Sequence, residues 1–249
     1  MEHTSPTPGL PGLSRSRLSP SGLGCLRVVP WQGDRFTALV GPRRDGRLPR
    51  GHDVHHCLDT LRARGVCRAV TPAMSPLDSR PFLDAGFVLH ERLHLLARSL
   101  TSPPPEPARP THRGFPWHRQ PVLDIDQRAF EPFWRFDELT LREARRATPS
   151  SRFRVSRDDR SSRVVGYAVT GRAGDRGYLQ RLAVDPTTKG HGHGTDLVND
   201  ALTWLHRRRA QTVLVNTQER NTRALALYER LGFERLADGL VVLRWENPT

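Results

Sequence analysis

The sequence contains no long apolar run. Its 249 residues hold no stretch near the ~18 uninterrupted apolar residues that a membrane-spanning helix requires. The first 23 residues are rich in proline, serine and glycine and lack the apolar block of a secretory signal. We therefore expect neither a membrane partner nor secretion, and we predict a cytoplasmic protein.

Cysteine is scarce. The three cysteines, Cys25, Cys57 and Cys67, are odd in number and show no C-x-x-C spacing. A disulfide framework needs paired cysteines, and a zinc knuckle needs closely spaced ones. The sequence therefore predicts reduced thiols and argues against a disulfide-rich fold.

Lysine is almost absent, since Lys189 is the only one in the chain. Lys and Arg together number 39 against 26 Asp and Glu, which gives a formal net charge of +13. Such an excess ordinarily raises nucleic acid as a partner. The arginines are scattered through every segment, however, whereas a nucleic-acid footprint is a clustered patch. A nucleic-acid partner is therefore not favoured.

Prolines divide the chain into parts. Four prolines among small polar residues predict a disordered tail at 1–24, and six prolines predict an extended linker at 101–119. The remaining parts are a small half-domain at 25–100 and a larger domain at 120–249. Both are expected to end in the order helix, strand, short helix, Gly-Phe, strand, with Gly86-Phe87 matching Gly232-Phe233. The first copy lacks the glycine cluster of the second, so we interpret it as degenerate.

The larger domain shows alternating and helical periodicity. Three β-rich runs separated by turn-forming residues predict an antiparallel meander, at 152–155, 163–170 and 178–184. A further buried strand is expected at 212–215. Helical spacing predicts four helical segments, at 122–136 with a break at Pro132, at 139–147, at 195–209 and at 224–231. Asp137 is placed to cap the second of these.

A glycine cluster lies between the strand ending at Val184 and the helix beginning near Thr195. Glycines there let successive N–H groups point the same way, and a helix N-terminus adds positive potential, so the pattern suits a pyrophosphate. The spacing matches neither a Walker loop nor a Rossmann fingerprint. On glycine spacing alone, a flexible turn is an equal alternative.

Two motifs in register resemble the GCN5-related N-acetyltransferase (GNAT) family. The first is the phosphate loop Q/R-x-x-G-x-G/A, which appears here as Lys189, Gly192 and Gly194, with lysine in place of Gln or Arg. The second is N-x-x-A-x-x-x-Y-x-x-x-G-F, whose positions are Asn221, Ala224, Tyr228, Gly232 and Phe233. The resemblance covers about 120–245. It implies an α+β fold with a mixed, mostly antiparallel central sheet flanked by helices, preceded by a smaller degenerate GNAT-like half.

The resemblance implies acetyl-CoA as the acyl donor. In the family a bulge splays the strand ending in Leu-Ala-Val from the next strand, and pantetheine lies in the gap like an extra strand. The residues that the resemblance assigns to the cofactor are Leu182, Ala183, Val184, Lys189, Gly190, His191, Gly192, His193, Gly194, Thr195 and Asn221. Helix capping is the alternative role for Asn221.

The resemblance also implies the chemistry, which is direct attack of a primary amine on the thioester in a ternary complex. Tyr228 resembles the general acid of the family, because a phenol stays protonated at neutral pH and can donate to the departing sulfur. Packing beneath the helix is its alternative role. Some family members carry a glutamate base where this chain has Asn216. An ordered water at Asn216, a carboxylate such as Glu138 or Glu219, or an amine that arrives neutral would then serve.

The acceptor is expected to be a peptide N-terminus or a small amine. The family builds its acceptor wall from the first helices, where this chain has Asp124, Asp126, Phe130, Phe133 and Trp134; surface acids and a packed aromatic core are the alternative. No metal is expected, since His191 and His193 lack further ligands nearby in sequence, and solvent-facing loop histidines are favoured. A non-catalytic CoA-binding regulatory module is the alternative function.

Overall fold

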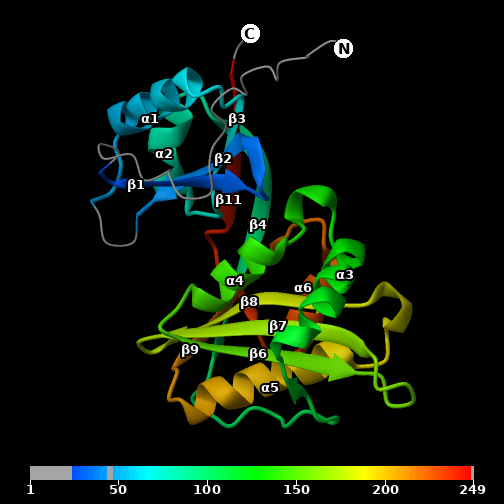
Figure 1. Cartoon of the computed structure of the whole chain (residues 1–249). Helices are drawn as coiled ribbons and strands as arrows, with labels where there is room; N and C mark the ends of the chain where they lie inside the picture. The colour runs from blue at the N-terminus through cyan, green and yellow to red at the C-terminus, as the bar shows by residue number, and fades with distance from the viewer. Residues whose placement is uncertain (1–23, 44–46, 248–249) are drawn as a thin grey trace, which may run out of the picture. The chain divides into compact units, whose positions relative to one another are not determined.

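The computed structural model describes residues 24–43 and 47–247. The predicted disordered tail at 1–24 therefore lies almost entirely outside the described residues. The chain forms two compact units (Figure 1). Unit 1 contains the described residues up to Leu93 together with those from Asp238 onward, and unit 2 runs from His94 to Ala237.

Unit 1 is a sheet covered by two helices. Its strands follow the order β1 (Leu26–Trp31), β2 (Asp34–Pro42), β3 (Arg68–Val70), β11 (Leu240–Glu246) and the first part of β4 (Val88–Ser99). The β2–β3 pair is parallel and the other pairs are antiparallel. Helices α1 (Gly51–Ala63) and α2 (Pro76–Asp84) bury Leu58, Leu61 and Phe82 in its core. This is the helix, strand, short helix, strand order that the sequence predicts for the first copy.

Two strands depart from the predicted division of the chain. Strand β11 closes the second copy in sequence, yet it pairs with β3 and β4 inside unit 1. Strand β4 closes the first copy, yet its residues from His94 onward belong to unit 2, where β4 neighbours β9 (Thr212–Gln218). The compact units therefore differ from the predicted ranges 25–100 and 120–249. Proline content marks irregular backbone, but it carries no information about which distant strand completes a sheet.

The proline-rich segment 101–119 lies wholly within unit 2 instead of linking two units. It contains the short strand β5 (His112–Arg113), which pairs with β6 (Ser150–Arg157), and the 3₁₀ turn η1 (Pro116–His118). Prolines carry no backbone N–H to satisfy, and side chains from the rest of unit 2 bond the segment, as Arg154 does by donating from Nε to the Thr111 hydroxyl at 2.9 Å. The segment is thus a packed strap.

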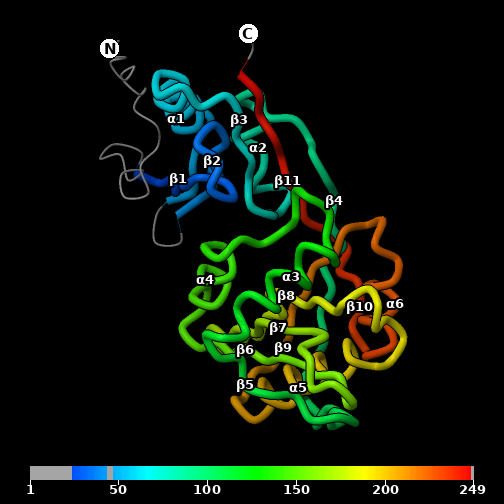
Figure 2. The backbone as a smooth tube through the Cα atoms, turned by 45° about the vertical axis from the view of Figure 1, so that its right-hand side comes forward, coloured from blue at the N-terminus to red at the C-terminus, as the bar shows by residue number. Residues whose placement is uncertain are grey.

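Unit 2 is built on a sheet in the order β4-β9-β8-β7-β6-β5. The strands β6 (Ser150–Arg157), β7 (Val164–Ala173) and β8 (Arg176–Val184) form an antiparallel meander, and β8 pairs with β9 in parallel. The short strand β10 (Glu234–Arg235) adds to β4 (Figure 2). The predicted meander and the mixed, mostly antiparallel α+β sheet are both confirmed.

Two apolar clusters flank this sheet. Helices α3 (Arg119–Ala129) and α4 (Glu138–Arg146) pack with Phe153, Tyr167 and other residues of β6 and β7 in one cluster. Helices α5 (His193–Arg207) and α6 (Thr222–Arg230) share the other cluster. Pro132 begins the 3₁₀ turn η2 (Pro132–Trp134), and Asp137 caps α4 by accepting a bond of 2.7 Å from the Thr140 N–H. The break at Pro132 and the cap at Asp137 are as predicted.

Candidate functional site

The glycine cluster forms a tight loop between β8 and α5. Asp185 follows β8 and caps the 3₁₀ turn η3 (Pro186–Thr188), accepting bonds of 3.0 and 2.8 Å from the Thr187 N–H and hydroxyl. Gly190 and Gly192 then take φ angles of +87° and +84°, in the left-handed region that favours glycine. Gly192 is the N-cap of α5 and has no side chain to occupy the first-turn N–H groups. The N-terminus of a 15-residue helix is therefore presented to an anion by a loop of glycines.

The polar side chains of the loop divide into exposed and buried ones. Lys189 and His191 are exposed, and the His191 Nδ1 lies 3.2 Å from the Thr188 carbonyl. His193 is buried, with its Nδ1 2.9 Å from the Ser156 hydroxyl. Burial first, and then the charge of Arg109, lower its pKa. The expectation of a solvent-facing histidine is correct for His191 and wrong for His193, because the first residue of α5 turns its side chain onto β6.

Strands β8 and β9 diverge beside this loop. Their parallel register ends at Tyr178–Leu214, although β8 continues to Val184 and β9 to Gln218. The β7–β8 register shifts between Val169 and Thr170, which skips Gln180 and marks a bulge in β8. Along Leu182–Val184 strand β8 pairs with β7, whereas β9 is no longer in register with it in the described part of the chain. The bulge and the splay predicted for this strand are confirmed.

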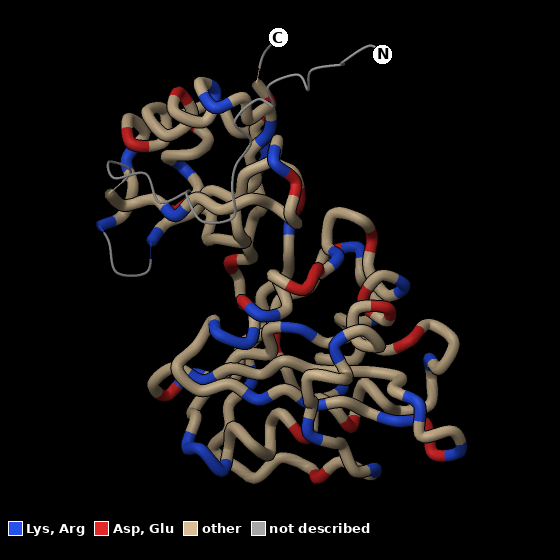
Figure 3. The backbone as a smooth tube through the Cα atoms, in the orientation of Figure 1, with Lys and Arg blue, Asp and Glu red and all other residues tan. Residues whose placement is uncertain are grey.

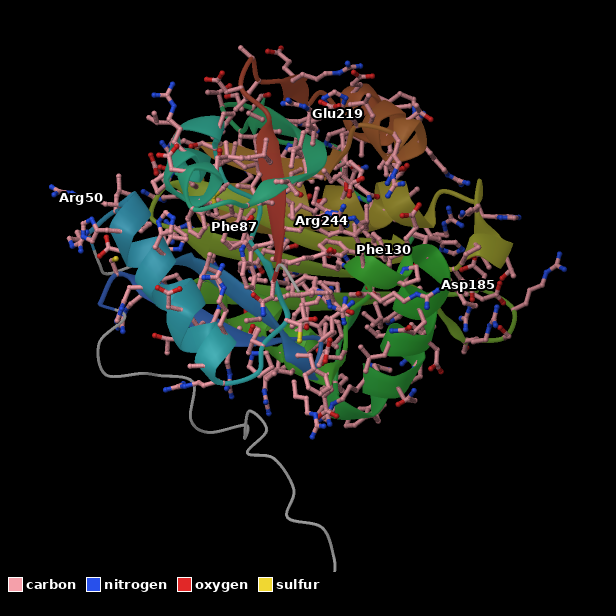
Figure 4. All side chains as sticks on the ribbon, turned by 90° about the horizontal axis from the view of Figure 1, so that it is seen from above. Arg50, Phe87, Phe130, Asp185, Glu219 and Arg244 are labelled. Atoms are coloured by element: carbon pink, nitrogen blue, oxygen red, sulfur yellow. The ribbon has the colours of Figure 1, made fainter. Side chains whose placement is uncertain are left out.

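Asn216 and Asn221 lie on β9 and at the start of α6. Asn216 is exposed on the part of β9 that lies beyond the last pair with β8. Asn221 is the N-cap of α6, and its Oδ1 accepts a bond of 3.1 Å from the Ala224 N–H. The capping role that the sequence left open for Asn221 is thus present. Glu219 lies at the turn between these elements and is exposed (Figure 4).

Tyr228 lies on α6 and is 5% exposed. Its ring packs against Phe233 at a centroid distance of 5.6 Å, so the packing role left open by the sequence is also present. Among the residues that the structure describes, none hydrogen-bonds its hydroxyl. Burial raises the pKa of Tyr228, so the phenol stays protonated.

Asp126 carries a buried polar network that the sequence did not reveal. Its carboxylate accepts bonds of 2.8 and 2.7 Å from Nε and Nη2 of Arg181, 2.6 Å from the Phe136 N–H, and a bond from the Tyr167 hydroxyl. Asp126 is 0% exposed and the Arg181 side chain 8%. Every acceptor direction of Asp126 is therefore used within the fold. An arginine in the otherwise apolar second half of β8 is the sequence signal that points to such a buried partner.

Aromatic rings enclose Arg181. Its guanidinium carbon lies 3.4 Å from the ring centre of Phe130 and 3.9 Å from that of Phe136. Its Nη2 also donates to the Trp134 carbonyl at 2.7 Å. The ion pair thus ties α3 and η2 to β8 (Figure 4 labels Phe130). The predicted acceptor wall consequently contains a neutralised carboxylate in place of a free surface acid.

Two more of the acids named from the sequence, Asp124 and Glu138, have partners as well. The Asp124 carboxylate accepts a bond of 2.8 Å from the Gln120 amide one turn earlier on α3. Glu138 forms an ion pair of 2.6 Å with Arg119. Both carboxylates therefore have a side-chain partner.

Unit 1 does not reproduce the splayed strands. In its parallel pair the register ends at Leu39–Val70, and a Cβ added to Gly41 would lie 2.7 Å from two ring carbons of Pro72. Pro72 therefore fills the space beside the end of β2. The N-terminus of α1 is also occupied, because the Asp53 carboxylate accepts a bond of 2.8 Å from the Arg50 N–H.

The described ranges contain neither a metal-binding cluster nor a membrane-spanning helix. No group of three or more His, Cys, Asp or Glu side chains is placed to hold a metal ion. No helix there is long and apolar enough to cross a membrane. Lys and Arg are spread over the backbone of both units and interleaved with acidic residues (Figure 3).

Comparison with known proteins agrees with this geometry. The sequence profile of the Acetyltransferase (GNAT) family matches residues 119–233. The chain carries a GNAT-family domain. Within that domain the profile spans the loop, the splayed strands and α6, and it reaches back to α3.

Curated relatives of the GNAT domain fall into two groups. N-alpha-acetyltransferase 30 of Saccharomyces cerevisiae is 39% identical over 61 residues, which are 24% of this chain and 35% of that protein. Mycothiol acetyltransferase of Thermobispora bispora is 29% identical over 214 residues, covering 79% of this chain and 71% of that protein. The Salinispora tropica protein of that name is 31% identical, covering 69% and 61%. The chain thus spans about a third of the yeast relative.

Solved structures show the same fold across both units. A tandem GNAT protein from the clavulanic acid biosynthesis pathway aligns with a TM-score of 0.66 at 20% identity, covering 90% of this chain and 79% of that one. A GCN5-related N-acetyltransferase from Sphaerobacter thermophilus aligns with a TM-score of 0.62 at 18% identity, covering 89% and 76%. The structural similarity therefore includes the first half of the chain as well as the GNAT domain.

Proposed function

We propose that the chain is an acetyl-CoA-dependent N-acetyltransferase that passes an acetyl group to a primary amine by direct attack in a ternary complex. The observation that carries the proposal is the divergence of β8 and β9 directly beside the glycine loop. An extended pantetheine arm fits a strand edge that lacks a ladder partner, and a pyrophosphate fits the helix N-terminus next to it. One donor molecule has both chemistries in the matching order.

The chain's own groups would hold the donor in two stretches. Backbone N–H groups from Gly190 to Thr195 bind the pyrophosphate, with Lys189 adding a point charge at the loop entrance. For His193 only the backbone is available, because its side chain is buried. Backbone groups of Leu182–Val184 bind the pantetheine arm. Asn221 contacts that arm through the part of its side-chain amide that the helix cap does not use.

Tyr228 acts in this proposal as the general acid. Its raised pKa keeps the proton on the hydroxyl at neutral pH, and none of the described residues competes for that proton. Tyr228 donates it to the sulfur as the amine displaces the thiol. Holding amine and thioester together supplies much of the rate through effective concentration.

The amine must lose a proton to a nearby group, and two carboxylates of the first helices already have partners. Asp126 is bonded on every side, and Glu138 is paired with Arg119. We assign to Asn216 the binding of a water that relays the proton, because it is exposed in the divergent part of β9. Glu219, also exposed, is the carboxylate that remains as an alternative.

The acceptor class is proposed from the relatives. One group is named for acetylation of mycothiol and the other for N-alpha-acetylation. We propose a primary amine, either a peptide N-terminus or a small amine. Asp126, whose charge is neutralised by Arg181, offers no negative charge to a polycationic acceptor.

Calorimetry with CoA tests the first half of the proposal. We expect one CoA per chain, because Pro72 fills the corresponding space in unit 1. Gly192→Val should abolish binding while circular dichroism stays unchanged, since valine disfavours the left-handed φ of this position. Absence of CoA binding to the wild-type chain would overturn the proposal.

Release of CoA thiol tests the second half. The full-length chain is incubated with acetyl-CoA and a panel of peptides with different N-terminal residues, amino sugars and polyamines. Acceptor-dependent release is expected for at least one class of primary amine. CoA binding without acceptor-dependent release from any amine would instead identify a non-catalytic CoA-binding module.

A further inference from the structure

The strap formed by the proline-rich segment reaches the glycine loop through one side chain. Arg109 donates from Nη2 to the His191 carbonyl and from Nε to Oδ2 of Asp196 at 3.0 Å. The Ala108 N–H donates to Oδ1 of the same carboxylate at 2.9 Å. Arg109 therefore joins the middle of the loop to the first turn of α5.

The contact with His191 fixes the direction of a loop amide. In a trans peptide the C=O of one residue and the N–H of the next point in opposite directions. Because Arg109 holds the His191 carbonyl, the Gly192 N–H points away from the strap. Gly192 also makes room for this contact, since a Cβ at that position would collide with the Arg109 guanidinium.

The contact with Asp196 neutralises a negative charge next to the loop. The Asp196 side chain is 3% exposed and lies in the first turn of α5. A buried carboxylate there opposes an anion bound at the same helix end, unless a cation neutralises it. Arg109 supplies that cation.

We propose that Arg109 is a positioning residue for the donor's pyrophosphate, which acts through the His191 carbonyl and through Asp196 without touching the donor. The inference rests on the proposed CoA binding. It adds to the site a residue that lies about 80 positions before the loop in sequence and outside both family motifs.

Calorimetry on the full-length chain tests the proposal. Arg109→Ala should weaken CoA binding about 10-fold or more, because it removes two charge-assisted contacts and exposes the loop to the Asp196 charge. Arg109→Lys should recover part of the loss, since lysine restores the charge without the fork. Asp196→Asn in the Arg109→Ala background should also recover part of it.

Arg152 offers a matched control. It donates two hydrogen bonds, of 3.0 and 2.8 Å, to the carboxylate of Asp200, which lies one turn further along α5. The Arg152 side chain is 29% exposed, compared with 31% for Arg109. Arg152→Ala should leave the CoA dissociation constant within twofold of the wild type. Pantetheine lacks the pyrophosphate, so its weak affinity, measured by NMR titration, should be the same in Arg109→Ala and wild type.

The outcomes separate this inference from the proposed function. If the wild-type chain does not bind CoA, the proposed function fails and the inference falls with it. If it binds CoA and Arg109→Ala binds within twofold, only the inference is overturned. Equal losses in Arg109→Ala and Arg152→Ala, or a parallel loss of pantetheine affinity, would show a general structural role and would likewise overturn it.

Discussion

Replacing Tyr228 with phenylalanine separates chemistry from packing. The change keeps the ring, which lies 5.6 Å from the Phe233 ring, and removes only the hydroxyl. None of the described residues hydrogen-bonds that hydroxyl, so the free energy of unfolding should change by less than about 1 kcal/mol. If Tyr228 is the general acid, kcat should fall by roughly 10²–10⁴-fold. That fall corresponds to about 2.7–5.5 kcal/mol in the activation barrier, well above the stability effect.

The assay is CoA-thiol release with the best acceptor from the panel, accompanied by thermal melting of each variant. The KM for acetyl-CoA should stay nearly unchanged, because the hydroxyl acts only as the thiol leaves. Tyr178→Phe is a suitable control, since Tyr178 lies in the last β8–β9 pair and has no assigned chemistry. Retention of more than half of the wild-type kcat by Tyr228→Phe would refute the assignment and would leave a water relay to supply the proton.

Three further predictions follow from the described contacts. Asp126→Asn should lower the free energy of unfolding by about 3–5 kcal/mol in urea titrations, because it leaves the buried Arg181 without a counter-charge; a loss below about 1 kcal/mol would contradict the network. Burial lowers the pKa of His193 below its ordinary 6.5, so its stabilising contribution is complete above pH 6.5 and is lost as pH falls through the folded-state pKa. His193→Asn, which can keep the Ser156 contact, should flatten this pH dependence of the melting temperature, and an unchanged slope would argue against it. Truncation after Ala237 removes β11 and should abolish the cooperative unfolding of unit 1, seen as lost amide protection in β3; unchanged protection would show that β11 is dispensable.

Local sequence determined most of unit 2. The meander, the helix break at Pro132, the cap at Asp137 and the glycines of the loop each follow from a few neighbouring residues, whose φ preferences and periodicity act over short distances. The two motifs located the loop and α6 in the same way. The bulge and splay of β8 were predicted through the family resemblance and not through the residues alone.

Only the tertiary structure decided which distant segments meet. Strand β11 completes unit 1, the proline-rich strap lies on unit 2, and Arg109 reaches the loop from it, although none of these partners is near in sequence. Burial likewise made Asp126, a candidate surface acid, the partner of Arg181, and it placed the His193 side chain against Ser156 of β6. The physical reason is that ion pairs and strand pairs depend on where the chain returns in space, whereas periodicity, caps and turns are set by residues within a few positions of one another.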